Sequence, residues 1–265
     1  MTQKILLREV EMSSILPKTI FITGATSGFG KATAKLFNDN GWQTIITGRR
    51  GDRLEKLAEE LGKNSLPLSF DVSDRRSVKS AIENLPPNFN NVSVLCNNAG
   101  LALGLEGADK ADLDDWDQMI DTNIKGLIYT TRNILPLMIE NGEGHIINIG
   151  SVAGSYPYPG GNVYGGTKAF VSQFSLNLRA DLVDKGINVT SLEPGLAETE
   201  FSLVRFKGDA DKASAVYKNT KIIKPEDIAE TIYWIATRPK NININRIEIM
   251  AGDQAFNPFN VVKKT

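Results

Sequence analysis

Residues Thr23–Gly30 read TGATSGFG and stand between a short β-branched run, Thr19–Thr23, and a stretch with helical spacing, Lys31–Asn40. Glycines at such a junction allow a tight turn and let the backbone approach an anion at the helix N-terminus, where free N–H groups and the helix dipole attract negative charge. The glycine spacing is GxxxGxG, not the GxGxxG of the usual dinucleotide fingerprint. A glycine-rich turn alone is a weak signal, but its place after the first strand favours a phosphate-binding loop. The residues of this expected loop are Gly24, Ala25, Thr26, Ser27, Gly28, Phe29 and Gly30.

Short β-branched runs alternate with longer stretches of helical spacing along the rest of the chain. The runs are Thr19–Thr23, Thr44–Thr47, Val92–Cys96, His145–Ile149, Ile187–Leu192 and Arg246–Met250, and the helical stretches are Lys31–Asn40, Asp52–Leu61, Asp74–Leu85, Asp112–Glu140, Tyr164–Asp184 and Pro225–Ala236. Strands that alternate with helices predict right-handed βαβ units and a parallel sheet. The expected fold class is therefore α/β: a single-domain, Rossmann-type, doubly wound parallel sheet with helices on both faces.

Composition limits the chemistry that the chain can perform. The 265 residues include 30 basic and 31 acidic side chains, and the net charge of -1 gives no overall attraction to nucleic acid or to an anionic membrane. The only cysteine, Cys96, excludes an intramolecular disulfide and a cysteine-cluster metal site, and it suits a reducing compartment. The only histidine, His145, excludes a His-rich metal site and most Ser-His-Asp or Cys-His mechanisms. We expect no bound metal, and we expect both residues to be structural.

No internal repeat or Pro/Gly linker divides the chain, so we expect residues 18–265 to form one domain. Residues 1–17 lack the apolar stretch of a signal peptide, and we expect them to form a loosely ordered extension. Apolar runs elsewhere are shorter than a membrane span requires, which favours a cytoplasmic protein. The irregular segment 195–220 follows the strand expected at Ile187–Leu192, where open α/β sheets bind ligands, so it is the expected substrate loop.

Two arginines follow the second expected strand. The sequence Ile45–Arg50 reads IITGRR, and Gly48 occupies the place where NAD enzymes carry an acidic residue for the ribose 2′-hydroxyl. The guanidinium groups of Arg49 and Arg50 match a 2′-phosphate, which favours NADP over NAD. The alternative is that one or both arginines only solvate the start of the next helix.

Further motifs occur at the ends of the expected strands and on the helices beside them. They are Asn97–Gly100 (NNAG), Asn123, Ser151, Tyr164–Lys168 (YGGTK) and Glu193–Gly195 (EPG). Together with TGATSGFG, in this order, these residues resemble the short-chain dehydrogenase/reductase family. The resemblance extends from about Lys18 to the C-terminus. It implies an enzyme in which the nicotinamide cofactor carries hydride and the protein orients it.

The resemblance assigns the catalytic roles to Ser151, Tyr164, Lys168 and Asn123. Because no histidine is suitable, the general base must be another group, and a tyrosine works near neutral pH only if positive charge stabilises its phenolate. Lys168 lies four residues after Tyr164, on the same helix face, and would supply that charge together with the oxidised nicotinamide. Ser151 would hydrogen-bond the substrate oxygen. Asn123 is expected to hold a water that relays the proton through Lys168.

The same resemblance implies further cofactor contacts. Asp71 and Val72 are expected at the adenine, although Asp71 could instead cap the next helix, for which Asp74 is better placed. Asn98, Ala99 and Gly100 are expected under the adenosine ribose, and Pro194, Gly195, Leu196 and Thr199 along the nicotinamide, with Thr199 binding the carboxamide. Tyr164 and Lys168 also belong to this cofactor site, where Lys168 would bind the nicotinamide ribose.

Longer stretches resemble one group within the family, the NADP-dependent 3-hydroxy acid dehydrogenases. These stretches are Asn97–Gly104, Met119–Leu127, His145–Ser151, Gly160–Val171 and Thr199–Asp209. The group acts on serine, L-allo-threonine or malonic semialdehyde and forms homotetramers, so the resemblance implies a small-molecule substrate and a homotetramer. Sulfoacetaldehyde reductases share much of the pattern, and they or other small aldehyde reductases are the first alternative. A non-catalytic NADP-binding sensor is the second, although the Ser-Tyr-Lys set argues against it.

A β-hydroxy acid carries a carboxylate close to the reacting carbon, so its site should offer a cation. Arg205 lies in the expected substrate loop, and Phe201 precedes it by one helical turn. A guanidinium suits a carboxylate or a sulfonate equally. The interpretation is therefore a substrate site that includes Ser151, Tyr164, Phe201 and Arg205. A surface salt bridge or a subunit contact remains an alternative for Arg205.

Overall fold

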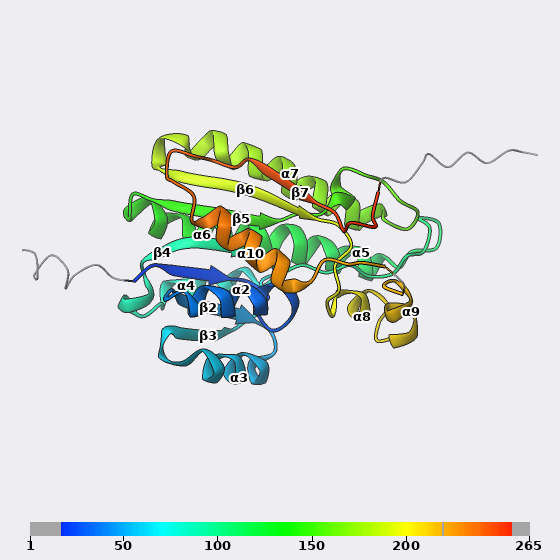
Figure 1. The fold of residues 1–265 in the computed structure, drawn as a ribbon, viewed down its shortest axis with the longest axis horizontal. Coiled ribbons are helices and arrows are strands. Elements are labelled where there is room, and N and C mark those ends of the chain that lie inside the picture. Colours follow the sequence, from blue (N-terminus) through cyan, green and yellow to red (C-terminus); the bar gives the residue numbers. More distant parts are fainter. Residues whose placement is uncertain (1–16, 219, 256–265) are drawn as a thin grey trace, which may run out of the picture.

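The computed structural model describes residues 17–218 and 220–255, and its centre is one sheet of seven parallel strands (Figure 1). The strands are β1 (Thr19–Ile22), β2 (Gln43–Gly48), β3 (Ser65–Ser69), β4 (Val92–Asn97), β5 (Gly144–Ile149), β6 (Ile187–Pro194) and β7 (Arg246–Ile249). They lie in the order β3-β2-β1-β4-β5-β6-β7, so the winding reverses between β1 and β4. The predicted doubly wound sheet is confirmed. The predicted N-terminal extension lies outside the described residues, apart from residue 17.

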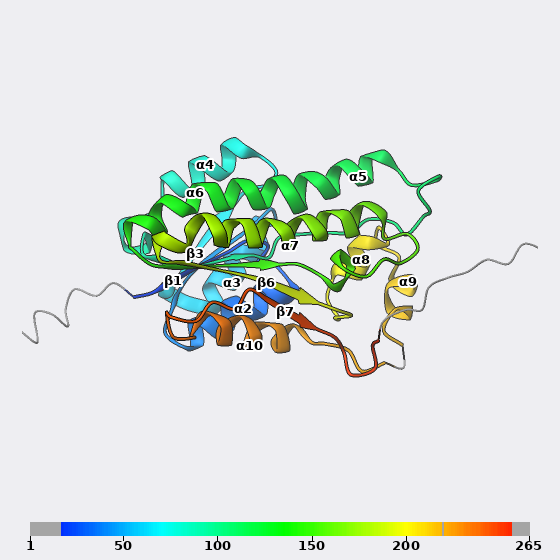
Figure 2. The ribbon, with the colours of Figure 1, turned by 90° about the horizontal axis from the view of Figure 1, so that it is seen from above.

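Helices cover both faces of the sheet, as predicted (Figure 2). The main helices are α2 (Gly28–Asp39), α3 (Gly51–Leu61), α4 (Arg75–Glu83), α5 (Leu113–Ile120), α6 (Leu127–Glu140), α7 (Asn162–Leu182) and α10 (Pro225–Ala236). Helices α2, α3 and α10 pack on one face, and α4, α6 and α7 pack on the other. No helix in the described part of the chain is long and apolar enough to cross a membrane.

Strand β1 shows how the two faces are built. Successive side chains of a strand point to opposite faces. Ile20 and Ile22 belong to the apolar cluster under α2 and α10, whereas Phe21 belongs to the cluster under α4 and α6. None of the three is exposed to solvent, and burial of each stabilises the fold by about 1.5–3 kcal/mol. A strand that is buried at every position therefore lies at the centre of the sheet, and it fixes the glycine-rich turn at its carboxyl end.

The helix predicted over Asp112–Glu140 is interrupted by one π-helical turn. Helix α5 ends at Ile120, residues Asp121–Gly126 form the π turn, and α6 continues from Leu127. A π turn widens the helix by one residue and changes the direction of the side chains on it, and such turns are frequent at functional sites. This turn carries Asn123.

The segment 195–220, which was predicted to be irregular, contains two short helices. They are α8 (Phe201–Arg205) and α9 (Ala210–Ala215). Both are too short to show a helical period in the sequence, and α9 is capped by Asp209, which accepts a hydrogen bond from the Lys212 N–H at 3.0 Å. The expectation of an irregular segment was therefore wrong at these two places. Its predicted position at the carboxyl end of β6 is confirmed.

Candidate active site

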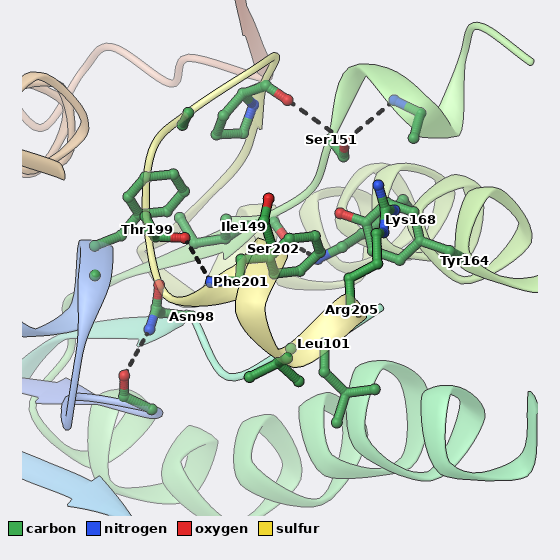
Figure 3. A pocket seen from close by; sticks show the side chains of 18 of the residues that line it. Asn98, Leu101, Ile149, Ser151, Tyr164, Lys168, Thr199, Phe201, Ser202 and Arg205 are labelled. Atoms are coloured by element: carbon green, nitrogen blue, oxygen red, sulfur yellow. Dashed lines mark hydrogen bonds between the residues drawn. The ribbon is translucent and has the colours of Figure 1, made fainter. Parts of the chain in front are cut away.

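A cleft of about 1120 Å³ lies at the carboxyl ends of the strands, and its reactive part is shown in Figure 3. Almost all residues that the sequence predicts for the cofactor and the substrate line this cleft. They are Gly24, Thr26, Ser27, Gly28, Phe29, Arg49, Arg50, Asp71, Val72, Asn98, Ala99, Gly100, Ser151, Tyr164, Lys168, Pro194, Gly195, Leu196, Thr199, Phe201 and Arg205. Three predicted residues, Ala25, Gly30 and Asn123, lie behind this lining and support it. The fold therefore gathers one site from six strand ends and the segment after β6.

The glycine-rich turn has the backbone conformation that its sequence predicts. Gly24 and Gly28 have φ values of 68° and 51°, in the left-handed region that favours glycine. A Cβ on Gly30 would lie 2.5 Å from the Gly24 carbonyl oxygen, so α2 can pack against the turn only without a side chain there. Helix α2 begins at Gly28, and Gly28 and Phe29 line the cleft, so the free N–H groups of its first turn lie at the cleft. This turn suits the pyrophosphate of a dinucleotide.

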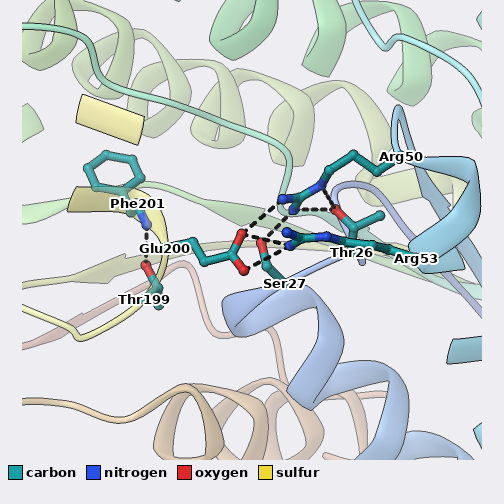
Figure 4. A network of polar contacts seen from close by, with 7 residues as sticks. All are labelled: Thr26, Ser27, Arg50, Arg53, Thr199, Glu200 and Phe201. Carbon is teal, nitrogen blue, oxygen red and sulfur yellow. Dashed lines mark hydrogen bonds and ion pairs between the residues drawn. The ribbon is translucent and has the colours of Figure 1, made fainter. Parts of the chain in front are cut away.

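The side chain of Arg50 lies across this turn (Figure 4). Its Nε and Nη2 donate to Thr26 Oγ1 at 3.1 and 2.7 Å, and Nη2 also donates to Ser27 Oγ at 3.1 Å. Its Nη1 donates to Glu200 Oε2 at 2.9 Å, and Arg53 Nη1 donates to the two oxygens of the same carboxylate at 2.8 and 3.0 Å. Arg50 is therefore more than a residue that solvates α3. It is fixed at the phosphate-binding turn and tied to the segment after β6.

Arg49 points to the end of β3. Its Nη1 lies 3.7 Å from Asp71 Oδ2, and 59% of the Arg49 side chain is exposed. Asp71 Oδ1 accepts hydrogen bonds from the Ser73 N–H and hydroxyl at 2.9 and 2.8 Å. Asp74, as predicted, caps α4 by accepting from the Arg76 N–H. Asp71 is thus free of the capping role, and it stands with the partly exposed Arg49 at the end of the cleft expected to hold the adenine and the 2′-phosphate.

The NNAG segment after β4 is bound to the glycine-rich turn. Asn98 Nδ2 donates to the carbonyl oxygens of Thr23 and Gly24 at 2.9 and 3.1 Å. The Thr23 hydroxyl accepts from the backbone N–H groups of Asn98 and Ala99 at 3.0 and 2.9 Å. The two loops therefore form one rigid floor, on which Ala99 and Gly100 leave room for a sugar.

Ser151, Tyr164 and Lys168 line the same part of the cleft (Figure 3). The Ser151 hydroxyl accepts from the Ala153 N–H at 3.1 Å and donates to the Pro194 carbonyl oxygen at 3.4 Å, and it lies close enough to the Tyr164 phenol to lower its pKa. Lys168 Nζ donates to the Ile149 carbonyl oxygen at 2.8 Å and lies 5.9 Å from the centre of the Tyr164 ring. The serine and the tyrosine can therefore hold one substrate oxygen between them.

Burial opposes charge on both titratable groups of this set. It raises the pKa of the Tyr164 phenol to about 12, although the nearby Ser151 hydroxyl and the positive charge of Arg205 lower that pKa. Burial also lowers the pKa of the Lys168 ammonium group to about 8. A working phenolate therefore needs more positive charge than Lys168 supplies from its present position, in line with the predicted contribution of an oxidised nicotinamide.

Asn123 lies on the π turn and is almost completely buried. Its Oδ1 accepts from the Leu101 N–H at 2.8 Å, and its Nδ2 donates to the Leu101 carbonyl oxygen at 2.8 Å and to Thr167 Oγ1 at 3.0 Å. The side chain thus fixes the chain directly after NNAG to helix α7. Both donor hydrogens of its amide are used by protein atoms, so the predicted water relay remains a prediction.

Arg205 extends from α8 over the ring of Tyr164. Its guanidinium carbon lies 5.1 Å from the centre of the Tyr164 ring and 5.3 Å from that of Phe201, and the Phe201 ring lies 5.6 Å from that of Tyr164. Arg205 Nη2 donates to the Tyr158 hydroxyl at 2.8 Å. Arg205 Nε is buried and has no hydrogen-bond partner among the described residues. The arginine predicted for the substrate therefore brings an unsatisfied donor to the reacting end of the cleft.

Three residues of this site were missed by the sequence reasoning. Glu200 and Arg53 form the ion pairs described above, and Tyr158 holds Arg205. Glu200 directly follows the predicted Thr199, and Arg53 is one helical turn beyond the two predicted arginines, so proximity in sequence was a weak signal for both. Tyr158 carried none, because it lies in the loop before α7 and outside any motif.

Cys96 and His145 are structural, as predicted. Cys96 is fully buried in the apolar core, and burial raises the pKa of its thiol to about 12. His145 Nε2 lies 2.8 Å from Thr190 Oγ1, and burial lowers the pKa of the imidazole to about 4. Neither residue lines the cleft.

A doubly wound sheet, a glycine-rich turn with arginines beside it, and a Ser-Tyr-Lys set define a dinucleotide-dependent oxidoreductase of the Rossmann type. The profile of the family described as short chain dehydrogenase matches residues 18–209. The chain belongs to this family.

Several relatives are similar over nearly their whole length. The chain is 56% identical to the NADP-dependent 3-hydroxy acid dehydrogenase YdfG of Salmonella typhi over 238 residues, 89% of this chain and 96% of that protein. It is 52% identical to the serine 3-dehydrogenase of Rhizobium radiobacter over 247 residues, 93% of this chain and 99% of that protein.

Two solved structures extend the comparison. The closed form of serine dehydrogenase complexed with NADP+ is 51% identical and superposes with a TM-score of 0.92, covering 93% of this chain and 100% of that one. A serine dehydrogenase from Escherichia coli is 46% identical with a TM-score of 0.80, covering 90% of this chain and 100% of that one.

Proposed function

We propose that this chain is an NADP-dependent oxidoreductase that interconverts a short 3-hydroxy acid and its 3-oxo or semialdehyde form. The expected substrates are of the serine, L-allo-threonine or 3-hydroxypropionate type. One observation carries this proposal: the guanidinium of Arg205, with a buried unpartnered Nε, lies beside the tyrosine that handles the proton. The Arg205 guanidinium is close enough to Tyr164 to bind the carboxylate of a short 3-hydroxy acid while the hydroxyl group of the same acid reaches Ser151 and Tyr164. The relatives that bear the names of 3-hydroxy acid and serine dehydrogenases support the same substrate class.

The residues of the cleft divide the work between them. In the oxidation, Ser151 holds the substrate oxygen and Tyr164 accepts the hydroxyl proton, while Lys168 contributes charge and a contact to the nicotinamide ribose. NADP, when bound, takes up the hydride from the carbon that carries the hydroxyl group. Phe201 forms the wall of the substrate pocket through its contact with the Tyr164 ring. Asn123 holds the chain at Leu101 against helix α7. A water bound to Asn123 is proposed to relay the proton to solvent.

The cofactor site fits NADP in particular. Arg50 is fixed at the glycine-rich turn and Arg49 lies at the edge of the same cleft. Their guanidinium groups suit a 2′-phosphate, and among the residues that line this end of the cleft the acidic ones, Asp71 and Glu200, are both paired with arginines. We therefore assign the phosphate to these arginines, the adenine to the region of Asp71 and Val72, and the nicotinamide carboxamide to Thr199.

The proposal includes a homotetramer in the cytoplasm. Leu176 on α7 and Trp234 on α10 are half-exposed apolar side chains, which support subunit contacts on these helices. A single buried cysteine suits a reducing compartment. Light scattering after size-exclusion chromatography measures the mass of the assembly directly, and a monomer would contradict this part of the proposal.

One assay separates the proposed function from its alternatives. The consumption of NADPH is measured with malonic semialdehyde, sulfoacetaldehyde and an uncharged aldehyde, and the formation of NADPH with serine, L-allo-threonine and 3-hydroxypropionate. We expect the highest kcat/KM with a carboxylate substrate. A preference for sulfoacetaldehyde would favour the reductase alternative, and tight NADPH binding without turnover of any substrate would favour the sensor.

A further inference from the structure

The reacting end of the cleft contains a cation that the short-chain dehydrogenase motif does not include. Arg205 belongs to α8, and its guanidinium lies among three aromatic rings, with its carbon 5.1 Å from the centre of Tyr164, 5.3 Å from Phe201 and 5.9 Å from Tyr158. The bond from Nη2 to the Tyr158 hydroxyl, at 2.8 Å, fixes this position. Figure 3 shows the side chain rising from α8 toward Tyr164 and Lys168.

The position of Lys168 makes this second cation important. Lys168 Nζ lies 5.9 Å from the centre of the Tyr164 ring and donates to the Ile149 carbonyl oxygen. The Arg205 guanidinium is therefore the nearer of the two cations to the ring. Among the described residues, the titratable or charged side chains that face Tyr164 are Lys168 on α7, Arg205 on α8 and Tyr158 in the loop before α7.

A positive charge over the face of a phenol stabilises the phenolate more than the neutral ring. The ring quadrupole attracts the cation in both forms, and ionisation adds a full negative charge at the edge of the same ring. The positive charge of Arg205 lowers the pKa of Tyr164, against the larger effect of burial, which raises it. Tyr164 is buried and the guanidinium of Arg205 is half-buried between Phe201 and Tyr158, so this interaction is screened less strongly than at the surface.

We propose that Arg205 is a positioning residue for the proton transfer, which it assists by stabilising the Tyr164 phenolate from α8, whether or not the substrate is charged. The inference rests on the proposed role of Tyr164. In the oxidation, the hydroxyl proton passes to the phenolate, the hydride passes to NADP+ and the carbon–oxygen bond becomes a carbonyl, so atoms and charges balance. Because Arg205 belongs to α8, this contribution is present only when that segment lies over the tyrosine.

This role and the binding of a substrate carboxylate predict different measurements. Carboxylate binding by Arg205 changes the KM of a charged substrate and leaves that of an uncharged one nearly constant. Stabilisation of the phenolate changes the pH at which the oxidation reaches half of its maximal kcat/KM, and it does so for both substrates. Loss of Arg205 raises the pKa of the Tyr164 phenol, and a phenol with a higher pKa ionises at a higher pH. The half-maximal pH should therefore move upward.

The experiment uses the full chain with NADP+ and two substrates, 3-hydroxypropionate and its uncharged methyl ester. The rate is measured from pH 6 to 10 for the wild type, Arg205→Gln, Arg205→Lys and Lys212→Gln. Lys212 is a matched control, because it is an exposed cation on the same segment that pairs with Asp209. With the ester, we expect the half-maximal pH to rise by about one unit in Arg205→Gln, to stay near the wild-type value in Arg205→Lys, and not to change in Lys212→Gln.

An unchanged ester profile in Arg205→Gln would overturn the proposal. An equal shift of the half-maximal pH in Arg205→Gln and Arg205→Lys would also overturn it, because a disturbed α8 segment and not the lost charge would then be responsible. The lysine variant therefore separates loss of charge from a structural disturbance of α8. If neither hydroxy acid nor semialdehyde is a substrate but the ester profile shifts as expected, the proposed substrate class is wrong and the role of Arg205 stands. If the ester profile is constant while the KM for 3-hydroxypropionate rises, Arg205 binds the substrate carboxylate only.

Discussion

Replacement of Arg49 and Arg50 together by alanine tests the assignment of the cofactor. The structure places Arg50 at the glycine-rich turn, with three hydrogen bonds to Thr26 and Ser27, and Arg49 beside Asp71. If both guanidinium groups contact the 2′-phosphate, the double variant loses charge-assisted hydrogen bonds that contribute about 1.5–3 kcal/mol. The dissociation constant of NADPH should then rise about ten- to a hundredfold.

The lower part of this range is the better expectation. The side chains of Arg49 and Arg50 are 59% and 40% exposed, so water screens their charge. NADH lacks the 2′-phosphate, so it loses no contact with the arginines through that group. Because Arg50 also orders Thr26 and Ser27, we expect the dissociation constant of NADH to rise by no more than about threefold, the effect of one ordinary hydrogen bond. The selectivity for NADPH, and not the affinity for both cofactors, is therefore the quantity that changes.

Nicotinamide fluorescence measures both dissociation constants, and steady-state rates with both cofactors give the matching kcat/KM ratios. Arg53→Ala is the control, because Arg53 shares the Glu200 carboxylate with Arg50 but does not line the cleft. It should leave the selectivity unchanged. The assignment fails if the double variant weakens NADPH and NADH equally, or if the wild type already prefers NADH.

Three further substitutions test other parts of the structure. Tyr164→Phe should reduce turnover by about 10²–10⁴-fold and leave NADPH binding intact, measured by steady-state rates and by fluorescence, and near-normal turnover would refute its role. Glu200→Gln removes a carboxylate that competes with NADPH for Arg50 and Arg53. NADPH, measured by fluorescence, should then bind a few times more tightly, and the KM for the hydroxy acid should rise. Weaker NADPH binding would contradict this reasoning. The pKa of His145 is lowered from 6.5 to about 4 in the folded chain. Between these two pH values the unfolded chain binds a proton that the folded chain does not bind. The free energy of unfolding should therefore fall by up to about 3 kcal/mol as the pH drops from about 6.5 to 4. In urea unfolding, His145→Gln should lose most of this pH dependence, and an unchanged dependence would assign it to carboxylates.

The sequence was sufficient for the parts of the site that depend on local chemistry. A glycine-rich turn between a strand and a helix has one conformation that suits it, and Gly24 and Gly28 have the positive φ values that this turn requires. Tyr164 and Lys168 share a helix face because they are four residues apart. Once the strand order is known, the motifs after β1, β4, β5 and β6 must meet, since parallel strands end at one edge of the sheet. These elements are determined by neighbours in the chain or by the topology.

The remaining contacts join residues that are far apart in the sequence. Glu200 meets Arg50 and Arg53 across about 150 positions, and Arg205 meets Tyr158 across 47. Charged and aromatic residues of this kind can adopt many partners, and a propensity or a period does not choose between them. Helix α8 is likewise too short for its pattern to reveal it, so its five residues are positioned by contacts with the cleft and not by helix propensity.

The segment from Thr199 to Arg205 connects the two halves of the site. Thr199 packs so closely on the glycine-rich turn that a Cβ on Gly28 would lie 3.2 Å from it. Glu200 is bound to Arg50, while Arg205, one turn further along α8, lies over the Tyr164 ring. These seven residues therefore connect the glycine-rich turn and Arg50 with Tyr164, the residue proposed to accept the proton. Since Glu200 and Arg205 stand at the two ends of one short helix, we expect a displacement of Glu200 to be transmitted to Arg205.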